Sequence, residues 1–342
     1  MDRESVEHMI EKPDSGASVK PGNRALDAQR QFYFCFMGFA LCFDESVQNC
    51  FPLLFTKFIL YDIIIIINNF KEVIKINKIF CKNSGEGPAK GTVIIVHGFG
   101  EYAGSYIEFA RRLAAANYSS VTFDQRGHGN LEDPRLRGII PGYQCFLDDI
   151  NSVYTQIKQE SPDTPVVLYG HSMGGNIAAN YMLAYPDSGL SCAVLESPWF
   201  GLYKEPSALI YALASVLGRI SPNLAINSPL SKSDVTSDTA KTDEMEKDPL
   251  YHNRISFRMV AGIKKACKNA ISNAPQISVP VYLAYAEHER IVSNQAIFNF
   301  YNNCIQNVTI KEYASCHAIH NDVAREGFYN DVISFIGAHC PI

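Results

Sequence analysis

Short apolar runs alternate with amphipathic stretches along the chain from about residue 91. The apolar runs are near-continuous and rich in β-branched residues, as expected for strands buried on both faces of a sheet. The stretches between them repeat apolar residues at helical spacing. The predicted strands are residues 92–96, 119–123, 166–169, 192–195, 279–285 and 308–313, the predicted helices include residues 107–116, 146–159 and 176–184, and residues 71–82 would suit an edge strand. This alternation predicts an α/β fold with a mostly parallel central sheet and helices on both faces.

The alternation breaks between residues 199 and 275. This interval holds a stretch rich in Pro and Ser, residues 221–237, and a charged run, residues 241–248, between helical segments. A segment that leaves a regular α/β rhythm and later returns to it is typical of an insertion. We interpret residues 199–275 as an inserted helical cap, and residues 86–198 together with residues 276–342 as the core that carries it.

Residues 1–85 fit this scheme poorly, and we treat them as an N-terminal extension. Residues 1–30 are polar without periodicity, whereas residues 31–69 are unusually apolar. The longest apolar run, residues 51–67, is short for a membrane span and contains one Lys and one Asp, which favours a surface-seated or buried segment over a spanning helix. The apolar region begins about 30 positions into the chain and follows acidic residues, so a cleavable secretion signal is not expected.

Net charge and cysteine content narrow the expected partners and compartment. The formal net charge is −5 and no dense run of Lys and Arg occurs, so nucleic acid is not an expected partner. The ten cysteines are scattered, without a C-x-x-C pair or a zinc-type spacing. Free thiols in a reducing compartment are the simplest interpretation, which predicts a cytoplasmic protein without a metal site.

The strongest local signal is GHSMGG at residues 170–175, which matches the pattern G-x-S-x-G. A predicted strand precedes it and a predicted helix follows it, which is the context of a nucleophile elbow. At such a turn the serine backbone is strained, and the flanking glycines avoid clashes with the neighbouring strand and helix. The pattern therefore predicts Ser172 as the nucleophile, with the first N–H groups of the following helix directed at a developing oxyanion.

A serine nucleophile needs a histidine base and an acid that orients it, and this fold places them in the order Ser, acid, His. Carboxylates follow the predicted strand 279–285, at the sheet edge where ligands bind in open α/β folds. Glu289 is preferred to Glu287 as the acid, because the turn must carry the carboxylate past the strand end. His317 follows the last predicted strand and is the predicted base.

Two backbone N–H groups are expected to form an oxyanion hole. Met173, the residue after the nucleophile, supplies the first group. Phe99 supplies the second, because the predicted strand 92–96 runs directly into the turn that contains this residue.

Three motifs resemble those of the monoacylglycerol lipase and lysophospholipase branch of the α/β-hydrolases, among the serine aminopeptidase S33-like hydrolases. HGFGEYAGSY at residues 97–106 resembles HGxGExxGRY, FDQRGHG at residues 123–129 resembles a D-x-R-G-H-G turn, and GHSMGG reproduces the elbow of that branch. The similarity runs from about residue 91 to the C-terminus and includes DPL at residues 248–250 in the cap. The resemblance implies the α/β-hydrolase fold.

The resemblance also implies roles for individual residues. The acid of that branch is the Asp of a G-x-x-D-R-I-V segment, which falls on Glu289, and its base falls on His317 of HAIHND. Glu101 and His320 match positions that contact the polar part of the substrate. The chain departs from the branch at Glu289, whose extra methylene lengthens the link to the imidazole, and at Ser105, which replaces an arginine near the site entrance.

These observations predict a serine esterase of the lipase type, which cleaves monoacylglycerol or lysophospholipid through an acyl-enzyme and needs no metal or organic cofactor. The cap has apolar residues at near-helical spacing between positions 209 and 217, so it is expected to roof an acyl pocket. The cap or the N-terminal apolar segment is expected to contact a membrane peripherally. Two alternatives stay open: a general carboxylesterase acting on smaller acyl esters, and a non-catalytic binding protein on the same fold.

Overall fold

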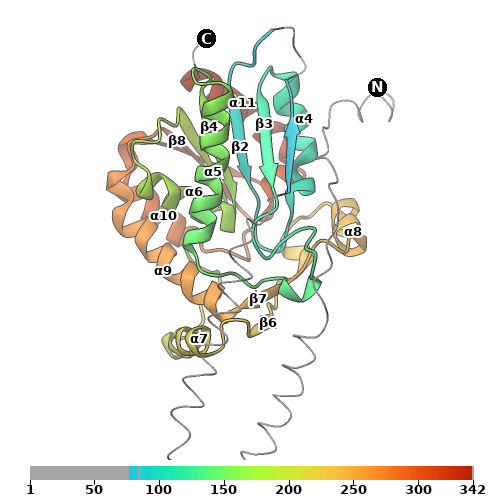
Figure 1. Cartoon of the computed structure of the whole chain (residues 1–342), viewed down its shortest axis with the longest axis vertical. Helices are drawn as coiled ribbons and strands as arrows, with labels where there is room; N and C mark the ends of the chain where they lie inside the picture. The colour runs from blue at the N-terminus through green and yellow to red at the C-terminus, as the bar shows by residue number, and fades with distance from the viewer. Residues whose placement is uncertain (1–76, 84, 86, 341–342) are drawn as a thin grey trace, which may run out of the picture. The chain divides into compact units, whose positions relative to one another are not determined.

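The computed structural model describes residues 77–83, 85 and 87–340. Within these residues, seven strands form one sheet in the order β1, β3, β2, β4, β5, β8, β9 (Figure 1). Neighbouring strands pair in parallel except β1 and β3, which pair antiparallel. The strands are β1 (Lys78–Cys81), β2 (Thr92–Val96), β3 (Ser119–Phe123), β4 (Val166–His171), β5 (Cys192–Glu196), β8 (Val281–Ala286) and β9 (Val308–Tyr313). The predicted α/β fold with a mostly parallel sheet is confirmed.

Helices cover both faces of this sheet, because alternate residues of each strand point to opposite sides. Ile94 and Leu168 join the core formed with α5, α6, α9 and α10, whereas Val93 and Val167 join the core formed with α4 and α11. Figure 1 shows α5 and α6 in front of the sheet and α11 behind it. These helices are α4 (Ile107–Ala115), α5 (Gln144–Glu160), α6 (Met173–Ala184), α9 (Phe257–Asn273), α10 (Asn294–Asn303) and α11 (Arg325–His339).

The edge strand expected within residues 71–82 is present as β1. It pairs with β3 from Lys78 opposite Phe123 to Cys81 opposite Ser120, so the sheet begins inside the segment that we treated as an extension. The apolar runs that precede residue 77 lie outside the described residues, and the surface-seated interpretation of residues 51–67 stays a prediction. In the part of the chain that the structure describes, no helix is both long and apolar enough to cross a bilayer.

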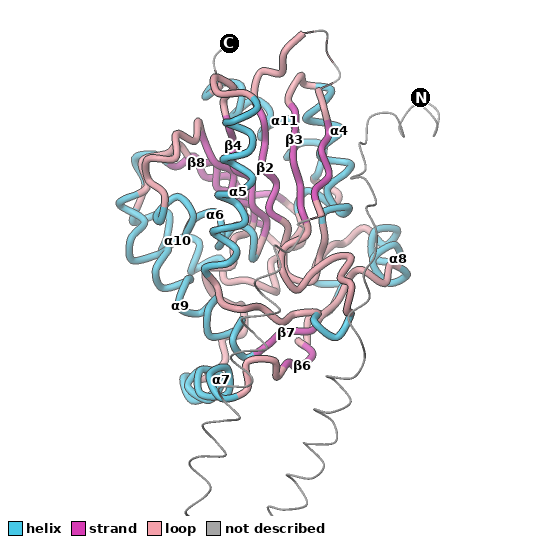
Figure 2. Tube along the Cα trace, viewed as in Figure 1, coloured by secondary structure: helices cyan, strands magenta, loops and turns pink. Residues whose placement is uncertain are grey.

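The cap lies between β5 and β8. It contains α7 (Ala208–Ile220), β6 (Ala225–Asn227), α8 (Thr239–Lys247), β7 (Arg254–Ser256) and α9. Strands β6 and β7 pair as a small antiparallel sheet beside α7 (Figure 2). Helix α9 differs from the rest, because it packs on α6 and contributes Met259, Ile263 and Ala270 to the main hydrophobic core. The last helix of the cap thus completes a layer of the core, and α7 packs on it.

Candidate active site

Ser172 lies in a tight turn between β4 and α6. Its backbone has φ 53° and ψ −115°, a region that residues other than glycine rarely adopt. Its N–H donates to Glu196 O at 2.9 Å, which holds the turn against β5. A Cβ on Gly170 would collide with the backbone of Gly174, and a Cβ on Gly174 would collide with the backbone O of Val96. The turn therefore has the geometry of a nucleophile elbow, with glycine required where strand and helix touch.

His317 and Glu289 form a buried pair in the loops that follow β9 and β8. His317 Nδ1 lies 2.7 Å from Glu289 Oε2. Glu289 Oε1 accepts hydrogen bonds from the N–H groups of Ile291 at 2.8 Å and Val292 at 3.1 Å. These bonds fix the carboxylate, so a glutamate reaches the imidazole although its side chain is one methylene longer than that of aspartate. Glu287, the alternative acid, is exposed.

Pairing raises the pKa of His317 and lowers the pKa of Glu289, so it favours the charged form of each residue. Burial alone would lower the pKa of His317, because a low dielectric disfavours the imidazolium. The Glu289 carboxylate outweighs that effect, with smaller contributions from Glu101 and Glu196, and the pKa of His317 is raised. Burial opposes the ionisation of Glu289, but the charge and hydrogen bond of His317 lower its pKa. With Nδ1 directed at the carboxylate as donor, Nε2 of His317 is left to accept a proton.

Ser172 and His317 line the same cavity, which has a volume of about 890 Å³. Phe99 and Glu101 from the loop after β2 and His171 from the elbow also line it. Among the described residues, the Ser172 hydroxyl makes no hydrogen bond, and His317 bonds only through Nδ1. Hydrogen bonds between nucleophile and base are often long before a substrate binds. The shared cavity wall is therefore the observation that joins the two residues.

Phe99 and Met173 occupy the places in the fold that an oxyanion hole requires. Phe99 lies on the cavity wall, in the loop after β2. Met173 is the first residue of α6, where the backbone N–H has no acceptor within the helix. The backbone N–H groups of Phe99 and Met173 are therefore the candidate donors to an oxyanion.

The loop after β2 is tied to the cap. Gly100 O accepts a hydrogen bond from the His252 N–H at 3.0 Å, and the Tyr102 hydroxyl donates to Asp248 Oδ2 at 2.6 Å. Gly100 has a φ of 76°, and a Cβ at this position would collide with the backbone O of His252. The cap therefore contacts the loop that carries Phe99 at Gly100, where a residue larger than glycine does not fit.

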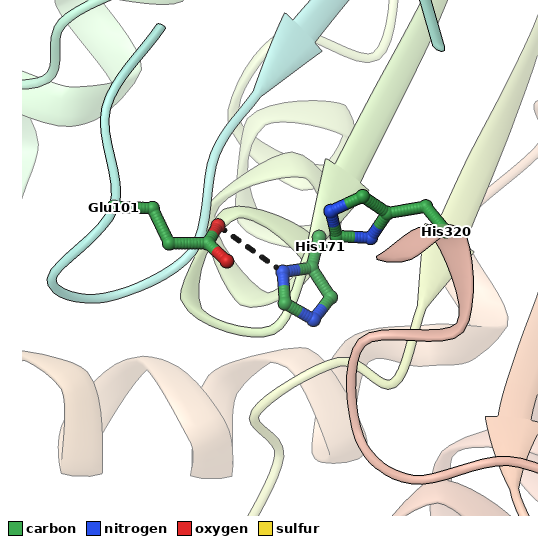
Figure 3. A group of neighbouring side chains, drawn as sticks. All are labelled: Glu101, His171 and His320. Atoms are coloured by element: carbon green, nitrogen blue, oxygen red, sulfur yellow. Dashed lines mark hydrogen bonds and ion pairs between the residues drawn. The ribbon is translucent and has the colours of Figure 1, made fainter. Parts of the chain in front are cut away.

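A second buried cluster adjoins the site and contains Glu101, His171 and His320 (Figure 3). Glu101 Oε2 accepts hydrogen bonds from the Gly98 N–H at 2.7 Å and the Tyr106 hydroxyl at 2.6 Å, and lies 3.3 Å from His171 Nδ1. The ligand atoms of the three clustered residues lie within 4.8 Å of one another, a group that could be considered for a metal ion. Protein partners satisfy Glu101 and His171 Nδ1, whereas the buried Nε2 atoms of His171 and His320 have no hydrogen-bond partner among the described residues.

His320 pairs with Glu196 instead of lining the cavity. Its N–H and its Nδ1 each lie 2.9 Å from Glu196 Oε1, and the Tyr169 hydroxyl donates to the same carboxylate. Burial opposes the ionisation of Glu196, but His320 is the main cause that holds its pKa at about 2. Burial likewise acts against a raised pKa at His320, and Glu196 reverses the effect. Of the two expected substrate contacts, the structure places Glu101 on the cavity wall and His320 away from it.

The comparison with known families identifies the fold family. Residues 87–324 match the family described as serine aminopeptidase, S33. The chain belongs to the serine aminopeptidase S33 family. This S33-family chain is 29% identical to an uncharacterized abhydrolase domain-containing protein of Dictyostelium discoideum and 26% identical to a putative monoglyceride lipase of Schizosaccharomyces pombe. The matches cover 72% and 67% of this chain, but only 26% and 62% of those two relatives.

A solved structure extends the comparison to three dimensions. The S33-family chain matches the crystal structure of a Paleococcus ferrophilus monoacylglycerol lipase with a TM-score of 0.71 and 25% identity. The match covers 78% of this chain and 100% of that one. The resemblance to the monoacylglycerol lipase branch of the α/β-hydrolases is thus confirmed.

Two residues of this S33-family site were not among those expected from the sequence. Tyr106 donates to Glu101 and packs its ring on His320 with the ring centroids 4.6 Å apart. Glu196 holds His320 and, through its backbone O, the turn at Ser172. Both had a signal in the sequence, since Tyr106 closes the HGFGEYAGSY motif and Glu196 is a charged residue at the end of an apolar strand. A carboxylate at that end of a buried strand indicates a partner nearby.

Proposed function

We propose that this S33-family protein is a serine hydrolase that cleaves carboxylic esters of lipids. The observation that carries the proposal is the cavity shared by Ser172 and His317, with Glu289 fixed behind the imidazole. A serine hydroxyl is a weak nucleophile, so a strained elbow beside an oriented histidine is costly unless it serves covalent catalysis. The names of the S. pombe relative and of the P. ferrophilus structure, a putative monoglyceride lipase and a monoacylglycerol lipase, support the same class of reaction.

The reaction proceeds by acyl transfer. His317 Nε2 takes the hydroxyl proton of Ser172 while Oγ attacks the ester carbonyl carbon, and Glu289 stays ionised beside the imidazolium. The N–H groups of Phe99 and Met173 stabilise the oxyanion. His317 then gives its proton to the leaving alcohol. A water molecule, deprotonated by the same histidine, attacks the acyl-enzyme, and His317 returns the proton to Ser172 Oγ as the fatty acid leaves.

The composition of the cavity wall supports a substrate with an acyl chain. The cap contributes apolar residues to the wall, among them Trp199, Leu202, Leu230, Val235 and Met245. Each methylene that leaves water for such a wall contributes about 0.8 kcal/mol. A cavity of about 890 Å³ would leave much of this wall unfilled with a short acyl ester. Monoacylglycerol and lysophospholipid are therefore the proposed substrates, ahead of smaller esters.

The outer face of α7 supports peripheral contact with a membrane. Leu209 is 78% exposed and Ile220 is 66% exposed, and Ile210, Leu213 and Val216 are each about half exposed. Large apolar side chains that gather on one helix are stabilised when they enter the interfacial region of a bilayer. Contact through α7 would bring the cavity to substrates that reside in the membrane.

Labelling with a fluorophosphonate tests the nucleophile. The reagent should label the purified full-length protein, and Ser172→Ala should abolish the labelling while leaving the thermal unfolding midpoint nearly unchanged. Hydrolysis of monoacylglycerol, lysophospholipid and short p-nitrophenyl esters then compares the proposed substrates with those of a general carboxylesterase.

The rival function is a binding protein on the same fold. Its support is the glutamate in place of the aspartate of the branch, which lengthens the link to His317. Absence of labelling in protein that is folded by circular dichroism would overturn the hydrolase and favour this rival.

A further inference from the structure

The cavity wall carries three cationic side chains in addition to its apolar part. They are Lys204 from the loop after β5, Lys232 from a short helical turn of the cap, and Arg290 from the loop after β8. These three segments are far apart in the sequence, and each brings a positive charge to the cavity that contains Ser172. A bound ester would therefore lie in a cavity whose wall carries these three charges.

Protein carboxylates leave these cations largely unneutralised. In the described part of the chain, Lys204 and Arg290 make no ion pair or hydrogen bond, and Lys232 Nζ donates only to the backbone O of Met245, at 2.6 Å. Both Lys204 and Arg290 are exposed, so their side chains are free to reorient toward a ligand. An unpaired cation beside a cavity favours an anionic group there.

The carboxylates next to Lys204 and Arg290 in the sequence have other partners. Glu205, next to Lys204, forms an ion pair with Lys264 and accepts the Leu202 N–H at 2.9 Å. Glu289, next to Arg290, is paired with His317. Two carboxylates lie on the cavity wall. Glu101 accepts hydrogen bonds from the neutral donors Gly98 N–H and Tyr106 hydroxyl and keeps its charge, and the Asp234 side chain makes no hydrogen bond or ion pair among the described residues. Two carboxylates, Glu101 and Asp234, thus face three cations, and these five side chains leave the wall with one net positive charge.

We propose that the preferred substrate is a lipid with one acyl chain and a phosphate in its headgroup, and that Lys204, Lys232 and Arg290 recognise the phosphate. The inference rests on the proposed function and chooses among its substrates. A neutral glycerol headgroup cannot form an ion pair with any of these cations. A phosphate presents several oxygens that can bind a guanidinium and two ammonium groups at once. The apolar wall and the cationic side chains together match the two halves of such a lipid.

Two substrates with the same acyl chain test the inference. Full-length protein is assayed with 1-decanoylglycerol and with its 3-phosphate, decanoyl lysophosphatidic acid, both as monomers below their critical micelle concentrations. We expect kcat/KM to be about tenfold higher for the phosphate, with an advantage that shrinks as salt is added, because partly exposed charge pairs are screened. Equal or faster hydrolysis of the neutral ester would overturn the inference while leaving the hydrolase intact.

Matched charge removals locate the effect. The double variant Lys204→Gln/Arg290→Gln should lower the ratio of the two kcat/KM values to nearly one. The control Lys265→Gln/Lys268→Gln removes two exposed charges of α9 that do not line the cavity, and it should leave the ratio unchanged. An equal loss of preference in both double variants would show a general effect of net charge and would overturn the assignment to the cavity.

A binding measurement separates this inference from the proposed function. The ether analogues 1-decylglycerol and 1-decylglycerol 3-phosphate cannot be hydrolysed, and their affinities for Ser172→Ala can be measured by calorimetry. We expect tighter binding of the phosphate whether or not the wild-type protein hydrolyses esters. Equal affinity of the two ethers would overturn the inference, and absent fluorophosphonate labelling of the wild-type protein would overturn the hydrolase.

Discussion

Two histidine–glutamate pairs lie three residues apart at the carboxyl end of the sheet. In each pair Nδ1 faces a carboxylate, at 2.7 Å for His317 and Glu289 and at 2.9 Å for His320 and Glu196. In each, the carboxylate raises the pKa of the imidazole against the effect of burial. The two histidines differ in the surroundings of Nε2. His317 lines the cavity together with Ser172. His320 Nε2 is buried and has no hydrogen-bond partner among the described residues. Pairing with a carboxylate thus raises the pKa of both imidazoles. Only His317 shares a cavity with the nucleophile, and this distinguishes it from His320.

The largest expected difference between the pairs is in the chemical step. His317→Asn should lower kcat by about 10⁴-fold, because it removes the proposed base. His320→Asn should lower kcat by less than about 100-fold, because His320 does not reach the substrate and affects the reaction only by positioning neighbouring residues. Single-turnover hydrolysis of the same ester by both variants measures the difference. Equal losses in two folded variants would break the comparison.

The carboxylates should separate activity from stability. Glu289→Gln should lower kcat by about 10³-fold, because the amide no longer favours the tautomer with Nε2 as acceptor. Glu196→Gln should lower the free energy of unfolding by about 3 kcal/mol, because it leaves buried His320 without its counter-charge. Urea unfolding and ester hydrolysis on both variants check the two effects. A stability loss confined to Glu289→Gln would reverse the assignment.

Shortening the acid tests the fit of the longer side chain. Glu289→Asp should lower kcat about tenfold, because the shorter carboxylate loses contact either with His317 or with the backbone N–H groups of Ile291 and Val292. Restoration of the aspartate found in the branch would instead raise kcat if the glutamate were a defect. Steady-state kinetics at one pH distinguishes these results.

The pH dependence of kcat/KM gives the smallest expected effect. The base must be neutral, and its pKa is raised, so activity should fall as the pH decreases through a midpoint above about 6.5. Glu289→Gln removes the main cause of the raised pKa and should move this midpoint to lower pH. Glu196→Gln removes a smaller contribution and should move it less in the same direction. A larger shift in Glu196→Gln would contradict the assignment of His317 as the base.

The sequence predicted the parts of the fold that depend on local pattern. Strands buried on both faces were recognisable from near-continuous apolar runs, and Ser172 was recognisable from glycines that its turn requires. The pairing of His320 with Glu196 was not, because the two residues are 124 positions apart and only the sheet brings them together. The position of Glu101 relative to His171 depends on the same long-range arrangement.

The sequence of helix α9 contains the pattern of a core helix, although we interpreted this helix as part of the cap. Its buried residues Met259, Ile263, Ala266, Cys267 and Ala270 follow one another at intervals of one, three and four, which is the spacing of a helix with one wholly buried face. A helix that roofs a cavity exposes more of its surface, as α7 does. The spacing alone does not say against which helix the buried face packs, and the contact with α6 came from the structure.

The hydrogen bond between Gly100 and His252 has a consequence for how proteins of this architecture can be recombined. The loop next to β2 provides both a proposed oxyanion donor and the anchor of the cap, and a Cβ at position 100 would collide with that anchor. Exchange of the cap for that of a relative would leave the loop without its matching surface. A working chimera must therefore transplant residues 97–106 together with the cap, although about a hundred positions separate them in the gene.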